Sequence, residues 1–575
     1  MKDFLLFFVV YYYNMSGDTL VYEMSTQSEG APSIFVKKDW LNILDTQNGN
    51  YSGNQCVIET SQLANSNKYM NYREAYLAVP MILTATGATI PAPATAATSV
   101  DYAFGLKNWF GSIIHSLTLE LGGTTIIQQT PYAGLWNSFK LMTSLSWQDV
   151  QTQGASIGFY PDNALSCAFT AAGTTDGLGT CNNRNLVAFP TVSGALNSFD
   201  TGNAGFLKRQ QYINYDPEGL TDVGDDAYST LLTSASCNAL YKSYVFNKVN
   251  AATGVFQIAI MGMIELKHLH SFFQNVPLLK GIFMKATLNL NQPQITSTLS
   301  AGKVPAVQVT SPLGGVNPVM IASATASNGG AVQVASQTTL VSLFVGNRCL
   351  WGTQTSIAGV SNSPFSNVVS LYVPAYVMNP VYEQAYLSSP VKRIVYTDIY
   401  NYVVNNVAPG ATFNNLVTSG ISGLKSVLVL PYYTATANGG VSPIQSPFDP
   451  AGAGPTSPLC LLNNFNVVVS GQNMIYNTQR YSYEQFMNNL AGCNAVNAGL
   501  TDGITSSLIG QLDFEMEYCY HYVNCSRVLP IEEQVSKSIT VIGQNQSAKA
   551  VDLYVFAEYG VEIKIDVLSG NRVSG

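Results

Sequence analysis

The sequence predicts an all-β chain that folds as two jelly-roll β-sandwich domains, with long loop insertions and a few short helices. Two stretches carry the alternation of a half-buried strand. Apolar residues occupy every second position before Pro293, at Ile282, Met284, Ala286, Leu288 and Leu290. The end of the chain repeats the pattern at Val561, Ile563, Ile565 and Val567. A period of two indicates one buried face, and proline cannot extend a sheet ladder.

An internal duplication predicts that there are two such domains. Residues 116–129 indicate a hairpin around a Gly-Gly pair, and residues 132–145 follow with the apolar spacing of a helix. Residues 465–476 repeat the hairpin, and residues 481–490 repeat the helix. Two copies of the same order of elements, each followed by an alternating strand, indicate a duplicated architecture with weak sequence identity.

The chain therefore divides, by prediction, into an N-terminal arm (1–55), a first jelly roll (56–292) and a second jelly roll (293–575). The arm is polar apart from an apolar island at residues 40–44. Further strands are expected at residues 76–83, 368–376, 394–404 and 423–431. Stretches rich in Gly, Pro, Ala, Ser or Asn predict loops at residues 84–100, 150–230, 293–340 and 435–458.

The composition favours a protein with large neutral interfaces. Only 10% of the 575 residues are charged, against roughly 25% in ordinary soluble domains, while the hydrophobic fraction is 47%. Neutral polar residues thus replace charge, which suits closely fitted contacts between copies. The net charge is −8 and no basic run is present, so strong direct binding to nucleic acid is not expected.

The first residues form an apolar run of ten, at residues 4–13. This run is too short to span a bilayer, which needs about 20 residues, and no convincing signal-peptide cleavage site follows it. We therefore expect no membrane span. Met15 opens a more ordinary sequence, and the two interpretations are a true start at Met15 or a buried N-terminal arm, with the first favoured.

The nine cysteines are odd in number, scattered, and without a CxxC pair. This pattern predicts buried thiols of a protein made in a reducing compartment rather than a disulfide framework or a zinc site. A Cys519–Cys525 or Cys167–Cys181 bridge is the alternative.

The sequence contains no recognised catalytic or phosphate-binding signature: no HExxH, GxSxG, GxxxxGK[ST] or GxGxxG. His268 and His270 would share a face of an extended segment and could bind a metal, but no third ligand lies near them and the segment has helical character. We assign no catalytic, cofactor-binding or metal-binding residue, and we expect no enzyme activity and no cofactor.

Acidic pairs at Asp225-Asp226, Glu515/Glu517 and Glu532-Glu533 require comparison with the paired carboxylates of glycosidases. The first pair lies in a turn-rich loop and the second lies among aromatic residues, so solvated or structural acids are the preferred interpretation. The 33 tyrosines are spread along predicted strands and are expected to pack rather than to bind sugar. A carbohydrate-active β-sandwich enzyme or lectin remains the alternative function.

Several blocks resemble the double jelly-roll major capsid proteins of polinton-like viruses and virophages. They include IELKHLHSFFQNVPLLKGIFMKATLNLNQ (264–292), FKLMTSLSWQDVQTQGASIGFYPDN (139–163) and NLVTSGISGLKSVLVLPYY (415–433). The remaining blocks are residues 371–402, the hairpin and helix of 465–486, and the closing stretch 552–566. The resemblance covers most of the chain but not the long loops.

This resemblance implies that the two jelly-roll domains lie side by side (a double jelly roll) and that the protein has a structural function. Such a protein forms a homotrimer that serves as a pseudo-hexameric capsomer, and capsomers tile an icosahedral shell around double-stranded DNA. Its partners would be itself, neighbouring capsomers and a single jelly-roll penton or minor capsid protein. Its location would be the virion, with assembly in the host cytoplasm or a viral factory. A minor capsid or penton protein is a third possibility, but it would normally be a single jelly roll, which the duplication argues against.

Overall fold

The structure is a computed structural model. It describes residues 33–63, 66–87, 102–162, 205, 209, 211–212, 245–250, 255–299, 306–311, 313–323, 337–348, 368–438, 440–447, 449–475, 480–493, 508–526, 535–567 and 572–573. Predictions for residues 4–13 and for the Cys167–Cys181 bridge lie outside the described residues.

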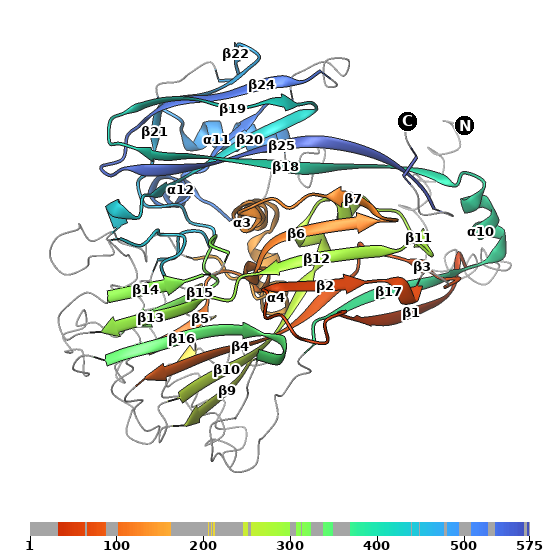
Figure 1. Cartoon of the computed structure of the whole chain (residues 1–575). Helices are drawn as coiled ribbons and strands as arrows, with labels where there is room; N and C mark the ends of the chain where they lie inside the picture. Colours follow the sequence, from red (N-terminus) through yellow and green to blue (C-terminus); the bar gives the residue numbers. More distant parts are fainter. Residues whose placement is uncertain are drawn as a thin grey trace, which may run out of the picture.

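Residues 391–566 form a sandwich of two four-stranded antiparallel sheets, which we call unit 2 (Figure 1). One sheet has the order β18 (Val391–Val407), β25 (Val551–Asp566), β20 (Leu424–Tyr433) and β23 (His521–Asn524). The other has the order β19 (Thr412–Ile421), β24 (Lys537–Asn545), β21 (Leu462–Val469) and β22 (Gln472–Asn473). Eight strands divided in this order between two sheets make a jelly roll.

Eight earlier strands have the same order, and we call them unit 1. One row consists of β1 (Phe35–Leu44), β17 (Ser370–Met378), β4 (Tyr76–Gly87) and β10 (Val255–Glu265). The facing sheet consists of β2 (Gln55–Glu59), β12 (Met284–Leu290), β6 (Ile114–Leu121) and β7 (Thr124–Ile127). The prediction of two jelly rolls therefore has a direct counterpart in the strand order of each unit.

Additional strands extend the first row into a ten-stranded sheet. They are β3 (Tyr69–Met70), β9 (Val245–Asn250), β11 (Leu279–Lys280), β13 (Gln294–Leu299), β14 (Ala306–Thr310) and β16 (Gln337–Val345). A third small sheet contains β5 (Tyr102–Leu106), β8 (Gln211–Tyr212) and β15 (Val319–Ser323). The prediction of loops across residues 293–340 is therefore wrong. Strand β4 is long enough for β17 to pair with its first residues and β16 with its last seven, which gives this insertion a sheet to join.

The first alternating stretch, which forms β12, does not take the place in unit 1 that β25 has in unit 2. In strand order, β12 corresponds to β24, and the counterpart of the closing strand β25 is β17. Alternation of apolar and polar residues shows that a strand has one buried face, but it does not show which sheet the strand joins. For this reason the sequences of β12 and β25 show the same pattern although the two strands occupy different places in their units. A boundary at residue 293 would separate β17 from β1 and β4, to which it is hydrogen-bonded. Likewise, β1 belongs to this sheet although the sequence placed it in the arm.

Both predicted hairpins are present, and both use the same kind of turn. Gly122 and Gly123 link β6 to β7 with φ of 54° and 80°, and Ser470 and Gly471 link β21 to β22 with φ of 48° and 83°. Positive φ at both central residues is what a two-residue type I′ hairpin requires. A helix follows each hairpin, α3 (Ala133–Ser144) and α11 (Tyr483–Cys493).

The other described helices are α4 (Trp147–Ile157), α8 (Leu266–Leu269), α9 (Phe272–Asn275), α10 (Pro380–Leu387) and α12 (Gln511–Met516). Single 3-10 turns lie at Ser61–Leu63, Phe110–Ile113, Gly346–Arg348 and Thr436–Asn438. Helix α4 overlaps the predicted loop at 150–230. Its start is fixed by a capping box, in which Ser146 and Asp149 bond each other's backbone N–H groups. Glycine at its end, Gly158, adopts the left-handed conformation of a helix C-terminus.

Candidate assembly surfaces

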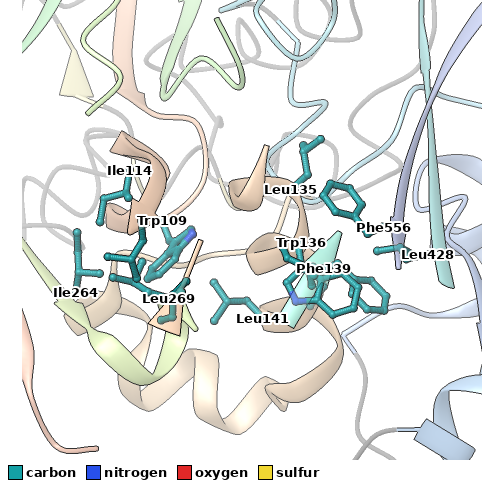
Figure 2. Close-up of a cluster of buried hydrophobic side chains, with 14 of the residues drawn as sticks. Trp109, Ile114, Leu135, Trp136, Phe139, Leu141, Ile264, Leu269, Leu428 and Phe556 are labelled. Carbon is teal, nitrogen blue, oxygen red and sulfur yellow. The ribbon is translucent and has the colours of Figure 1, made fainter. Parts of the chain in front are cut away.

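The two units share one continuous core, and helix α3 of unit 1 forms the centre of their contact (Figure 2). Phe556 of β25 lies with its ring centroid 6.1 Å from that of Trp136. Phe139 lies 5.2 Å from Tyr522 of β23 by the same measure. Aromatic pairs at such spacings add to the free energy of apolar burial. Helix α3 thus covers the outer face of the sheet that contains β25.

The side chains on this face of β25 alternate as a strand requires. Tyr554, Phe556 and Glu558 point to α3, whereas Leu553, Val555 and Ala557 belong to the interior of unit 2. Tyr132, just before α3, contacts Tyr554 edge to face at 4.9 Å. Helical spacing in the sequence predicted α3. It did not predict that α3 would be buried between unit 1 and the sheet of unit 2 that contains β25.

Hydrogen bonds reinforce the contact between units. The Lys107 ammonium is fully buried and donates to three carbonyl oxygens, those of Pro443, Ile444 and Ser446, at 3.0, 3.1 and 3.2 Å. The hydroxyl of Tyr396 donates to the carbonyl of Ile126 at 2.9 Å. A buried donor without a partner costs about 1–3 kcal/mol, so these matched groups also specify how the units fit.

A buried ion pair supports Lys107 from the other side. Arg209 and Asp162 are joined at 2.9 Å, and both side chains are 1% exposed. The Arg209 guanidinium also donates to the carbonyls of Leu106 and Lys107. These bonds fix the backbone that presents Lys107 to unit 2. The sequence gives no sign of this network, since its members are far apart along the chain.

The histidines considered as a metal site have separate partners. The segment is helical at α8, and the ring of His268 packs edge to face on Trp109, while His270 lies 3.4 Å from Asp398 of unit 2. Burial lowers the pKa of His268 to about 4. Among the described residues, no group of three or more His, Cys, Asp or Glu side chains is arranged to hold a metal ion.

The acids that an alternative glycosidase function would use are not brought together where the structure describes them. Glu515 forms an ion pair with Arg480, and Glu517 is buried. Asp225-Asp226 and Glu532-Glu533 lie outside the described residues. The described acids therefore give this alternative no support.

The cysteines whose side chains the structure describes are buried thiols. Cys56, Cys460, Cys519 and Cys525 are all buried, and no disulfide joins Cys519 to Cys525. Burial raises the pKa of Cys56 and of Cys519 to about 12. A thiol with a raised pKa carries little thiolate and is a poor nucleophile.

A partly exposed aromatic surface lies on the outer face of unit 1. We call it the outer patch, and it consists of Phe35, Trp40, Tyr76, Tyr372 and Tyr376. Adjacent ring centroids are 4.7 to 5.6 Å apart, and Tyr76 and Tyr372 are stacked. Trp40 is 49% exposed and the other four rings are half-buried. Strand β1 adds Val36 and Leu44, which are 67% and 52% exposed. Partly exposed aromatic side chains in contact with one another, beside exposed apolar residues, are typical of protein–protein interfaces.

Charged residues frame this patch. The Lys38 ammonium lies over the rings of Trp40 and Tyr376 at 5.5 and 5.2 Å and forms an ion pair with Glu74 at 2.6 Å. The hydrogen bond that Lys38 donates to Glu74 raises the pKa of Lys38. A cation held over aromatic faces leaves the patch amphipathic rather than wholly apolar.

In both units the first strand is an edge strand of its described sheet. Among the described pairings, β1 bonds only to β17, and β18 bonds only to β25. Unit 1 covers part of the β18 edge, because Ser271 bonds the backbone of Thr397 in both directions, at 2.5 and 2.9 Å. An open edge strand is a ready site for pairing with another chain unless it is covered.

None of the described helices is long and apolar enough to cross a membrane.

Neither a protein-family model nor a curated protein matches this sequence. Solved structures do resemble it. A chain in the 3.5 Å cryo-EM structure of the Sputnik virophage is 12% identical, with a TM-score of 0.51, over 96% of this chain and 90% of that one. The mavirus major capsid protein is 11% identical with a TM-score of 0.48, covering 98% and 94%. The Faustovirus major capsid protein is 9% identical with a TM-score of 0.40, covering 94% of each chain.

The likeness to the Sputnik chain extends over nearly the whole length of both chains, and at this identity it bears on the fold. Together with the strand order of units 1 and 2, it confirms the fold class predicted from the sequence: an all-β double jelly roll with a few short helices.

Proposed function

We propose that the chain is a major capsid protein: a structural, non-enzymatic subunit that trimerises into pseudo-hexameric capsomers, which tile an icosahedral shell around double-stranded DNA. One observation carries this proposal. The same eight-strand order occurs twice, and the chain shares this duplicated fold from end to end with a chain of the Sputnik virophage. The low charge and the outer patch fit a surface that is covered by further copies.

Two similar units in one rigid chain explain how a trimer gains six-fold appearance. Each unit presents one sandwich, so three chains arrange six sandwiches around an axis. We further propose that the boundary between units lies at residues 379–390 rather than at 293. Helix α10 occupies this stretch and has no buried residue, and the strands on either side of it belong to different sheets.

The proposal places the protein in the virion, with assembly in the host cytoplasm or a viral factory. Its partners are other copies of itself and a single jelly-roll penton or minor capsid protein. The low charge supports self-association over direct DNA binding.

Light scattering on the purified chain tests the proposal, together with negative-stain microscopy. We expect the mass of a trimer, hexagonal particles in projection, and shells at high protein concentration. A monomer at all concentrations would reject the capsid function, whereas turnover or binding of glycans would favour the carbohydrate-active alternative.

A further inference from the structure

The first and the last described strands meet at one end of the molecule, beside α10 (Figure 1). The carbonyl of Ile34, just before β1, accepts the backbone N–H of Asn379, just before α10, at 2.9 Å. After α10, Val391 of β18 pairs with Asp566 at the end of β25. The added strands β13, β14 and β16 lie at the opposite end (Figure 1). We call the α10 end the terminal surface, and it consists of residues 33–38, 379–395, 561–567 and 572–573.

The terminal surface exposes aliphatic side chains to solvent. Val381 of α10 is 71% exposed, and Val36 of β1 is 67% exposed. The surface holds half of the strongly exposed aliphatic side chains in the described part of the chain, namely Ile34, Val36, Val381, Val391, Val395 and Val573. A single exposed valine is ordinary, but the concentration of such residues at one end indicates a surface that makes a contact.

The same surface is basic, although the whole chain has a net charge of −8. Taken together with the ion-pair partners of its charged residues, it contains eight cations and five acids. The cations are Lys37, Lys38, Lys68, Lys280, Lys392, Arg393, Lys564 and Arg572, and the acids are Asp39, Glu74, Glu383, Glu562 and Asp566. Lys564 and Arg572 are exposed, so part of this positive charge reaches solvent.

This combination fits a lipid surface better than a protein partner. The exposed valines occur singly beside cations, as in Val391-Lys392-Arg393 and Arg572-Val573. A stable protein interface has a contiguous core enriched in aromatic residues, and none of the strongly exposed side chains of the terminal surface is aromatic. Lipid requires no such core, because the headgroup region accepts scattered apolar side chains and anionic headgroups attract Lys and Arg.

We infer that the terminal surface rests on the headgroup region of a bilayer that contains anionic lipid. This inference rests on the proposed function, since one surface of every subunit in a shell faces the interior, and it assigns the α10 end to that side. The valine and isoleucine side chains enter the headgroup region, while the cations lie against lipid phosphates. Three chains in a capsomer present three such surfaces, so contacts that are weak singly add together.

Flotation of the full-length protein with vesicles tests this contact. Vesicles of phosphatidylcholine with about 30% phosphatidylserine are compared with phosphatidylcholine alone, at about 150 mM salt. We expect the protein to float with the anionic vesicles, and the recovered fraction to be at least about fivefold smaller with the neutral ones. Protein that does not float with either kind of vesicle would overturn the inference.

Two double variants locate the contact. Val381→Glu combined with Val391→Glu places two carboxylates in the terminal surface, and the floated fraction should fall by at least about fivefold. Leu340→Glu combined with Leu416→Glu makes the same change on β16 and β19, at side chains that are 41% and 56% exposed, and should float like the wild type. Circular dichroism and light scattering show whether both variants fold and assemble alike. Equal flotation of the two variants would place the contact elsewhere and reject the terminal surface.

A competing DNA duplex separates lipid binding from general attraction to polyanions. Excess duplex should leave the protein on the vesicles, since DNA phosphates offer the valine side chains no apolar contact. Displacement by the duplex would overturn the lipid assignment.

The outcomes also separate this inference from the proposed function. A wild-type chain that is trimeric but does not float would reject only the lipid contact. A chain that is monomeric throughout would reject the capsid function, and its flotation would still decide whether the terminal surface binds lipid.

Discussion

At the scale of single residues, His521 shows how burial makes this fold sensitive to acid. The ring is fully buried; its Nδ1 lies 2.9 Å from the carbonyl of Cys519, and its Nε2 accepts the backbone N–H of Leu462 at 3.3 Å. A neutral ring with its proton on Nδ1 satisfies both contacts. Protonation of Nε2 would remove the acceptor for Leu462, and burial lowers the pKa of His521 to about 3.

The sign of the effect follows from the two states of the chain. An unfolded histidine has a pKa of about 6.5, so below that pH the unfolded chain binds a proton at this histidine while the folded chain keeps the ring neutral. The neutral ring of His521 therefore makes its full contribution to the free energy of unfolding above pH ~6.5, and this contribution is lost progressively as the pH falls toward the pKa of the folded state. At pH ~5 one such group lowers the free energy of unfolding by about 2 kcal/mol.

We therefore expect His521→Gln to flatten the pH dependence of stability. Denaturant unfolding at about pH 7.5 and about pH 5 measures, for wild type and variant separately, how much the free energy of unfolding falls between the two pH values. The variant is less stable at the higher pH, but its loss on acidification should be smaller by about 2 kcal/mol. Carboxylates contribute equally to both proteins, so equal losses would show that His521 is not the group responsible.

At the scale of elements, the two hairpins allow a test of turn chemistry. Ser470 adopts φ of 48° and is exposed, a conformation that glycine and asparagine accept more readily than serine. Ser470→Asn should therefore raise the free energy of unfolding by roughly 0.5 kcal/mol, and Ser470→Val should lower it by about 1 kcal/mol. Denaturant titration measures both changes. A stability order with valine above asparagine would contradict the assigned turn.

The sequence was sufficient to predict individual strands, hairpins and helices, but not the pairing of the strands. Alternation, Gly-containing turns and helical spacing are local, and they identified both hairpins, α3, and the strands β17, β18 and β20. The partner of a strand is not local. Strand β17 pairs with β1 across more than 300 residues of sequence, and β12 joins β2 and β6 rather than the closing sheet. The outer patch was visible only as an apolar island near Trp40, since its other members come from distant strands.

At the scale of the whole molecule, the charge distribution predicts weak interaction with DNA. Described cations near the surface pair with acids, as Lys68 does with Asp39, Lys280 with Glu383 and Arg393 with Glu562. Nucleic acid binding depends on clustered cations that displace counterions. Fluorescence anisotropy with a labelled duplex at about 150 mM salt should show no binding tighter than about 100 µM. Tighter binding would point to a basic surface formed by residues outside the described ranges.

The contact between units also determines whether the chain unfolds as one body. Trp136 is 7% exposed and packs between Phe139 and Phe556, so its truncation leaves a cavity where the two units meet. Trp136→Ala should lower the free energy of unfolding by about 3–5 kcal/mol, the usual cost of removing a large buried aromatic side chain. Trp147→Ala removes the same side chain from an exposed position and should change stability by less than about 0.5 kcal/mol.

Cooperativity gives the sharper readout for Trp136. If α3 couples the units, weakening its contact should separate a single unfolding transition into two, because each unit retains its own pair of sheets. Tyrosine and tryptophan fluorescence, followed beside far-ultraviolet circular dichroism, should coincide in the wild type and diverge in Trp136→Ala. Coincident transitions in the variant, with stability equal to that of Trp147→Ala, would mean that α3 does not hold the units together. The rigid geometry that would let three chains close into a ring would then need another source.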